Sequence, residues 1–150
     1  MENFRMTLKF NAPVDRLYDA IARRGLEWWS TVGTVSTKVG EVCEFRFPKA
    51  DFFAKFEVTE LSPNQAIEWR CVGCKHPDSA GHKNPQDWVE TRLRFELFAG
   101  LEDTTELRFE HVGLSPALEC YDSCATIWPH YLNKSLRALV EGGTPKPYAD

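Results

Sequence analysis

The chain has 150 residues, a formal net charge of −4 and a sequence pI of about 5.6. This length suits one domain that buries a single core without disulfides or a metal. The acidic balance argues against nucleic acid and anionic lipid as partners, because both select a basic surface. No run approaches the ~20 apolar residues of a membrane span, and the first residues lack a secretory pattern, so we expect a cytoplasmic protein.

Two features of the composition stand out. Five cysteines, an odd number without a secretory signal, suit a reducing compartment in which thiols stay free. Aromatic residues make up 13% of the chain, with five Trp and ten Phe, which exceeds the needs of routine packing in a domain this small. Since an aromatic side chain buries about 150–250 Å², these residues could fill a core or line a sizeable pocket.

The first thirty residues predict a strand followed by two helical segments. Apolar and polar side chains alternate over residues 4–10, which is typical of a half-buried strand. From residue 14 to residue 24 the apolar spacing changes to three and four, which predicts an amphipathic helix that Gly25 ends. Residues 26–30 predict a helical turn that leads to the sheet.

The middle of the chain predicts a meander of antiparallel strands, because short apolar alternations are separated by turn residues. Residues 73–86, rich in Gly, Pro, Asp, Ser and Asn, form the longest predicted loop. In the strand over residues 88–98, Val89, Thr91 and Leu93 are expected to face inward, while Arg92 and Arg94 join an outward charged row. The predicted strands cover residues 32–38, 42–47, 52–61, 66–72, 88–98 and 105–111.

A long amphipathic helix is predicted to close the chain. Ser115-Pro116 has the residue types of an N-cap and first helical position, and apolar residues then recur every three or four positions as far as Leu139. Pro129 falls inside this pattern, so we expect a kink or two helices end to end. Gly142-Gly143 ends the helix, and residues 144–150 are expected to form a loose tail.

This order of elements resembles the helix-grip fold of the START-like (SRPBCC) superfamily, and within it the branch of activator-of-heat-shock-protein-ATPase homologues of the stand-alone bacterial type. The resemblance implies one α+β domain over residues 1–150, with six to seven strands wrapped around the C-terminal helix. Its members bind lipids, polyketides or other hydrophobic molecules, and some are cyclases, aromatases or hydrolases. The residues that carry it are 12–21, Trp28-Trp29, Val39-Gly40, 45–47, 105–114, Trp128, Tyr131, Ser135-Leu136 and Leu139.

The leading functional hypothesis is a cavity between the sheet and the C-terminal helix that binds a small hydrophobic or aromatic molecule without a cofactor. A completely filled core would use the same inward aromatics, and the sequence leaves both possibilities open. Polar side chains among the candidates could orient a ligand. The candidate ligand-binding residues are Trp29, Phe45, Phe47, Phe56, Trp69, Phe95, Phe109, His111, Tyr121, Trp128, Tyr131 and Ser135.

Two further functions stay open. An inward-facing His111 could act as acid or base in a cyclase-like, aromatase-like or hydrolase-like enzyme, although it could equally hydrogen-bond a neighbouring backbone group. The resemblance also implies a co-chaperone-like interaction module, and a homodimer is left open.

The strongest metal-like motif is Cys71-Val-Gly-Cys74, with His76 and His82 beyond it. Cys71 occupies an inward strand position and no second C-x-x-C follows, so we interpret the motif as one core cysteine and a mobile loop with two surface histidines. A metal or redox role of these four residues stays open. Cys120 and Cys124 lie one helical turn apart, a spacing too common to indicate a site, and no metal site is assigned.

Overall fold

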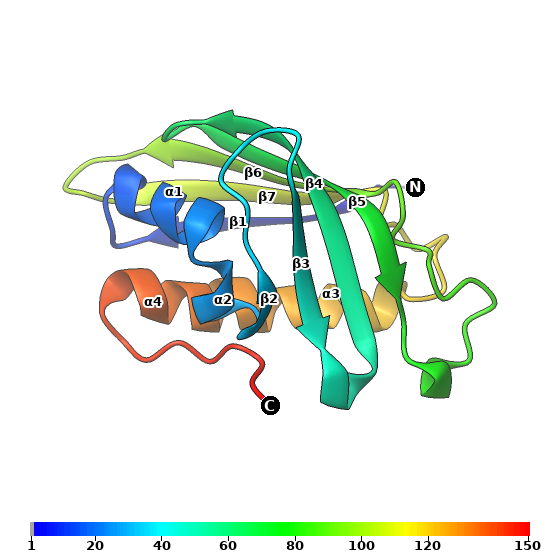
Figure 1. The fold of residues 1–150 in the computed structure, drawn as a ribbon. Helices are drawn as coiled ribbons and strands as arrows, with labels where there is room; N and C mark the ends of the chain where they lie inside the picture. The colour runs from blue at the N-terminus through cyan, green and yellow to red at the C-terminus, as the bar shows by residue number, and fades with distance from the viewer. Residues whose placement is uncertain (1) are drawn as a thin grey trace.

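A seven-stranded antiparallel sheet curves around the C-terminal helix in the computed structural model, which describes residues 2–150 (Figure 1). The strand order is β1-β7-β6-β5-β4-β3-β2, so the meander runs across the sheet and the first strand joins its far edge. The predicted α+β helix-grip fold is therefore confirmed. The strands are β1 (Phe4–Phe10), β2 (Val32–Thr34), β3 (Val42–Phe47), β4 (Phe52–Ser62), β5 (Ala66–Lys75), β6 (Arg92–Ala99) and β7 (Thr105–Val112).

The helices lie on the concave side of the sheet, and the C-terminal one runs across it (Figure 1). None of them, within residues 2–150, has the length and apolar character that a bilayer-spanning helix requires. They are α1 (Val14–Arg23), α2 (Gly25–Trp28), α3 (Tyr121–Trp128), the π-helical segment η3 (Pro129–Leu136) and α4 (Arg137–Glu141), with single 3-10 turns η1 (Pro48–Ala50) and η2 (Asp78–Ala80).

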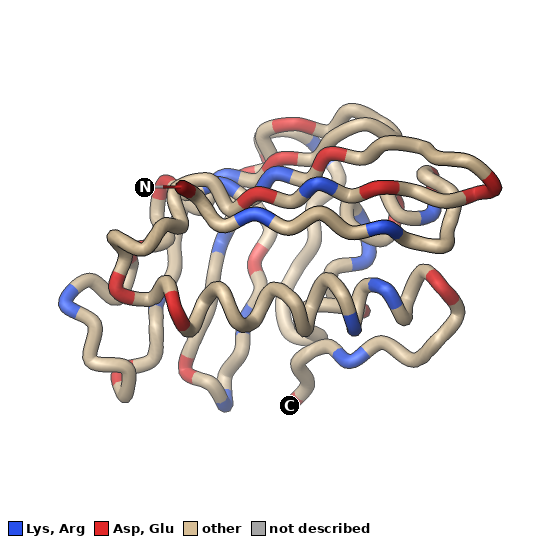
Figure 2. Tube along the Cα trace, turned by 180° about the vertical axis from the view of Figure 1, so that it is seen from behind, with Lys and Arg blue, Asp and Glu red and all other residues tan. Residues whose placement is uncertain are grey.

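Alternation gives the two faces of the sheet opposite chemistry. Acidic and basic residues of both signs recur along the strands (Figure 2), at positions that alternate with buried ones. Arg70 bonds Glu57 at 2.7 Å and Arg94 bonds Glu60 at 2.8 Å, which confirms that Arg94 belongs to an outward charged row. Because such pairs are partly exposed, each contributes only about 0–1 kcal/mol to stability.

The strand predicted over residues 88–98 is shorter than its alternation indicates. Glu90 adopts a left-handed backbone with φ of 75°, and the Thr91 amide donates to the Trp88 carbonyl at 2.8 Å, so a turn precedes β6. Trp88 is consequently fully buried, and Val89 is only half-buried. Val89, which was predicted to face inward, packs against the core but stays partly exposed, because a turn, unlike a strand, does not preserve the two-residue period.

The C-terminal helix also begins later than predicted. Residues 115–120 form successive turns, in which the Leu118 amide donates to the Ser115 carbonyl and the Tyr121 amide to the Leu118 carbonyl. The interruption expected at Pro129 is confirmed, since the winding changes there from α to π. Proline has no amide hydrogen to donate into the preceding turn, which favours a change of winding at this point.

Residues 144–150 are docked on the protein, so the expected loose tail was wrong. The Tyr148 amide donates to the Trp29 carbonyl, and the Thr31 amide donates to the Tyr148 carbonyl, each at 2.9 Å. The Tyr148 ring contacts Phe47 at 5.2 Å between centroids, and its hydroxyl accepts a hydrogen bond from the Lys49 amide at 2.7 Å. These contacts connect the tail to the residues directly after α2, to β3 and to η1, an attachment that has no local sequence signal.

Replacement of Tyr148 tests this attachment. We expect Tyr148→Ala to lower the free energy of unfolding by about 1–3 kcal/mol, because Phe47 loses the ring that covers it. The matched variant Tyr148→Phe keeps the ring and should lose only about 0.5–1.5 kcal/mol with the hydroxyl hydrogen bonds. Urea denaturation measures both, and an alanine variant as stable as the wild type would show that the tail contributes no packing.

Candidate functional site

His111 lies at the centre of a closed hydrogen-bond chain. The Trp128 indole Nε1–H donates to His111 Nδ1 at 3.3 Å, which makes Nδ1 an acceptor and places the ring proton on Nε2. Nε2 lies 2.9 Å from the Thr91 hydroxyl, which itself donates to the Trp88 carbonyl at 2.6 Å. Every polar atom of the imidazole therefore has a partner while the ring is neutral.

Burial keeps this imidazole neutral. His111 is fully buried, and desolvation lowers its pKa from 6.5 to about 3. The ring is nearly perpendicular to those of Trp88 and Trp128, with centroid distances of 4.7 and 5.8 Å. A general acid or base must be within reach of the proton that it transfers. Because His111 is fully buried, protein surrounds the ring and a substrate has no access to it. The geometry supports a packing role for His111.

Most of the predicted ligand-binding aromatics fill the interior. Trp128 packs against Trp29 at 5.3 Å, against Phe109 at 4.8 Å and parallel to Trp88 at 6.0 Å between ring centroids. Ser135 is also buried, and its hydroxyl donates to the Trp28 carbonyl at 2.7 Å. Tyr121 is half-buried at the first turn of α3. The predicted aromatics with at most 3% exposure are Trp29, Phe45, Phe56, Trp69, Phe95, Phe109 and Trp128.

An apolar groove remains at one end of this interior, between α3 and the tip of the β3–β4 hairpin. Its volume is about 230 Å³. The predicted residues Trp29, Phe47 and Tyr131 line it, and burial raises the Tyr131 pKa above its ordinary value. Sequence reasoning missed the other lining residues as ligand contacts. They are Ala50, Phe52, Pro77, Trp88, Ser123, Cys124 and Ile127.

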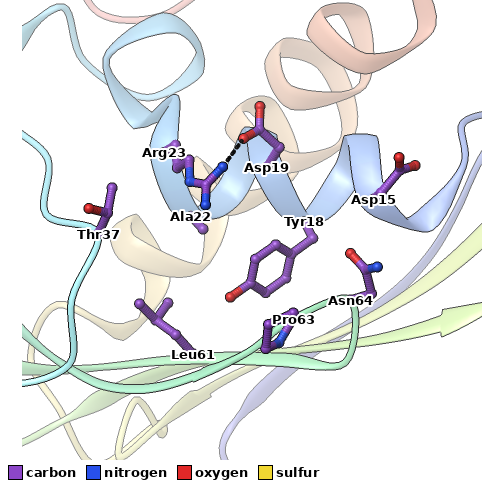
Figure 3. Close-up of a pocket in the computed structure, with 9 residues that line it drawn as sticks. All are labelled: Asp15, Tyr18, Asp19, Ala22, Arg23, Thr37, Leu61, Pro63 and Asn64. Atoms are coloured by element: carbon purple, nitrogen blue, oxygen red, sulfur yellow. Dashed lines mark hydrogen bonds and ion pairs between the residues drawn. The ribbon is translucent and has the colours of Figure 1, made fainter.

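A second hollow, of about 380 Å³, lies between α1 and the turn that joins β4 to β5 (Figure 3). The Tyr18 ring reaches toward Pro63 and Leu61, while Arg23 pairs with Asp19 at 3.2 Å on the helix surface. That arginine and aspartate are 63% and 43% exposed, so their charges are solvated. Such a hollow offers little desolvated surface to a ligand, and we favour the aromatic groove.

The long loop after β5 brings two distant parts of the chain together. His76 is only 4% exposed, so its predicted surface position was wrong. The loop is fixed by Glu119, whose carboxylate accepts hydrogen bonds from the Lys83 and Asn84 amides at 2.9 and 3.2 Å. His76 thereby lies beside two cysteines of the C-terminal helix region, Cys120 and Cys124.

Cys71 and Cys74 are both buried, which confirms that Cys71 is a core residue. An irregularity in the β4–β5 pairing places Cys71 opposite Phe56 and Cys74 opposite Ala54, so both thiols face the interior. The proximity of Cys74 and burial together raise the Cys71 pKa far above its ordinary value. Thiolate chemistry is therefore disfavoured at Cys71.

The enclosed state of His111 predicts a specific acid sensitivity. Between pH 6.5 and 3 the unfolded imidazole binds a proton that the folded one does not, so stability falls as the pH drops. From pH 7 to pH 5 this residue should remove about 2 kcal/mol of unfolding free energy. His111→Gln cannot titrate and should lose about 2 kcal/mol less over the same interval, as measured by urea denaturation. Equal losses in both proteins would mean that the imidazole is not buried in its neutral form.

Comparisons with known proteins agree with this architecture. A family model described as "Activator of Hsp90 ATPase homolog 1-like protein" matches residues 11–141. A solution structure of the Aha1 dimer from Colwellia psychrerythraea is 26% identical over 95% of this chain and 98% of its own, with a TM-score of 0.74. No curated protein matches the chain.

Two less similar structures share the fold. A crystal structure of a protein from Mesorhizobium loti is 20% identical over 92% of this chain and 97% of its own, with a TM-score of 0.72. An HSP90 activator from Plasmodium falciparum is 16% identical over 94% of this chain and 97% of its own, with a TM-score of 0.66. Since the family model spans most of the chain, the protein belongs to the family of Activator of Hsp90 ATPase homolog 1-like proteins.

Proposed function

We propose that the protein binds a small aromatic or otherwise apolar molecule in the groove between α3 and the β3–β4 hairpin. The observation that carries the proposal is an open groove lined by five aromatic side chains, two of them half-buried and three buried, beside an interior that is otherwise filled. Apolar surface that converges in a concavity is the usual form of a small-molecule site. The aromatics are Trp29, Phe47, Phe52, Trp88 and Tyr131.

The volume of the groove limits the ligand. Sites for drug-sized molecules span about 300–1,000 Å³, and an engineered cavity of about 150 Å³ is large enough for benzene. A groove of about 230 Å³ therefore suits a molecule of one or two rings rather than a lipid chain or polyketide. The Ser123 and Tyr131 hydroxyls at its wall are polar groups that could orient such a ligand.

Two variants on α3 test where the ligand binds. Ser123 lines the groove and Thr126 does not, yet both belong to α3, are exposed and donate a hydroxyl hydrogen bond to the carbonyl three residues earlier. We expect Ser123→Phe to fill the groove and weaken binding of naphthol at least about tenfold, a loss of ~1.4 kcal/mol. Thr126→Phe should bind naphthol like the wild type.

Titration of naphthol into the ¹⁵N-labelled chain gives both the affinity and the location, through shifts of the indole and backbone signals around Trp29 and Ile127. The proposal is contradicted if naphthol shifts no groove signal, or if the two phenylalanine variants bind it equally well.

A second candidate function, the co-chaperone-like module, is favoured by the family match over residues 11–141.

We also propose that the protein forms a homodimer, because the Colwellia relative is described as a dimer. A cytoplasmic location is part of the same proposal, and it is supported by five free cysteines, which suit a reducing compartment.

The co-chaperone function predicts a change in the ATPase rate of an Hsp90. We expect a concentration-dependent rise when the chain is added to an Hsp90 from a bacterium, measured as phosphate release with and without a specific Hsp90 inhibitor. A rate that stays constant up to saturating protein would remove this candidate and leave the groove proposal unaffected.

A further inference from the structure

Three buried side chains with metal-binding atoms meet next to the groove proposed above as the ligand site, and one of them, Cys124, also lines that groove. His76 directly follows the last residue of β5, whereas Cys120 and Cys124 lie at the start of α3. The candidate ligand atoms of these three residues all lie within 4.8 Å of one another. In a tetrahedral zinc site with bonds of about 2.0–2.3 Å, ligand atoms are roughly 3–4 Å apart. Small side-chain movements would therefore bring the three groups into the first coordination sphere of one ion.

A fourth group beside this cluster lacks a suitable partner. The Asp87 side chain is 5% exposed, and its Oδ1 lies 2.8 Å from His76 Nε2. That contact does not have hydrogen-bond geometry, and within residues 2–150 neither carboxylate oxygen nor His76 Nε2 has a hydrogen-bond partner. A buried carboxylate without a hydrogen bond is costly, and a positive charge on the imidazole or a cation in the cluster would offset the cost. Carboxylates also commonly accompany the imidazole ligands of metals.

The backbone fixes both halves of the cluster. The His76 amide donates to the Pro85 carbonyl at 2.7 Å, which closes the loop between His76 and Asp87. The bonds from the loop to Glu119, the residue before Cys120, hold that loop against the start of α3. The Cys124 amide donates to the Cys120 carbonyl at 2.8 Å, so the two thiols are one helical turn apart. A site whose ligands are already held close loses little conformational freedom when the ion binds.

From these contacts we propose that the protein binds one Zn²⁺ ion through Cys120, Cys124 and His76, with Asp87 placed against the imidazole. Two thiolates and an imidazole are ligands that zinc favours, whereas calcium and magnesium select oxygen ligands. The site differs from the C-x-x-C motif in the sequence, because Cys71 and Cys74 are not in the cluster. It shares only Cys124 with the wall of the groove, so each proposal can fail without the other.

Metal titration of the full chain tests the site directly. Protein purified under reducing conditions and stripped of metal should take up one equivalent of Zn²⁺ in competition with a chromophoric chelator. With Co²⁺ in place of Zn²⁺, we expect thiolate-to-cobalt charge-transfer absorption and the intense visible bands of a tetrahedral site. A reduced chain that takes up no Zn²⁺, or a cobalt spectrum without thiolate bands, overturns the proposal without any variant.

Matched variants then assign the ligands. Cys120→Ser, Cys124→Ser and His76→Gln should each weaken Zn²⁺ binding by at least about 100-fold, and Asp87→Asn by about 10–100-fold, as expected for a group that contacts a ligand. The controls Cys43→Ser and Cys71→Ser alter equally buried thiols outside the cluster and should bind Zn²⁺ like the wild type. Near-ultraviolet circular dichroism checks that each variant is folded. Binding that survives in folded Cys120→Ser and Cys124→Ser, or that is lost in Cys71→Ser, contradicts the assignment.

Discussion

The packing of Trp128 between the sheet and the remaining helical and loop segments is the interaction on which the other features depend. Its ring contacts Phe109 of β7 and Trp29 after α2, and it stacks on Trp88 from the loop before β6. Its indole nitrogen fixes the tautomer of His111. One side chain thus connects four parts of the chain that are distant in sequence. Because aromatic contacts of this kind bury a large area, they also occupy the space that an internal cavity would need.

The filled interior explains why the best candidate for ligand binding lies at the margin of the fold. At the edge of the aromatic core, an open groove rather than a closed chamber is lined by Trp29, Phe47 and Tyr131. A ligand there would keep one side near solvent. The enzyme hypothesis based on His111 gains no support, because that ring is fully buried and does not line the groove.

The C-terminal helix presents different chemistry at successive turns of one face. Cys120 and Cys124 meet His76 near its start, Ile127 and Tyr131 border the groove, and Ser135 bonds the backbone of α2 farther on. Steps of three and four residues align these positions because they match the helical repeat. The long loop after β5 brings His76 to Cys120 and Cys124. Its hydrogen bond to Glu119 therefore holds the cluster of these three residues together and keeps the loop against the start of the helix.

The sequence by itself determined the elements that depend on local periodicity. Alternation in residues 4–10 and 52–61 predicted strands and their inward faces, and the spacing from Val14 predicted α1, because both periods follow from backbone geometry alone. The interruption at Pro129 was equally local, since it follows from the missing amide hydrogen. Among the predicted ligand contacts, Phe47 was placed correctly on the inner face, but the alternation could not say that it would border an opening.

Only the tertiary structure decided what the inward side chains enclose. Whether Phe95 and Trp128 fill the interior or surround a void depends on the distance between sheet and helix, which no residue pattern encodes. The meeting of His76 with Cys120 depends on a loop that is held by the hydrogen bond from His76 to Pro85 and by hydrogen bonds to Glu119. The docking of Tyr148 is likewise a contact between segments about a hundred residues apart. Such contacts arise from three-dimensional packing, so periodicity, which reports only neighbours along the chain, could not predict them.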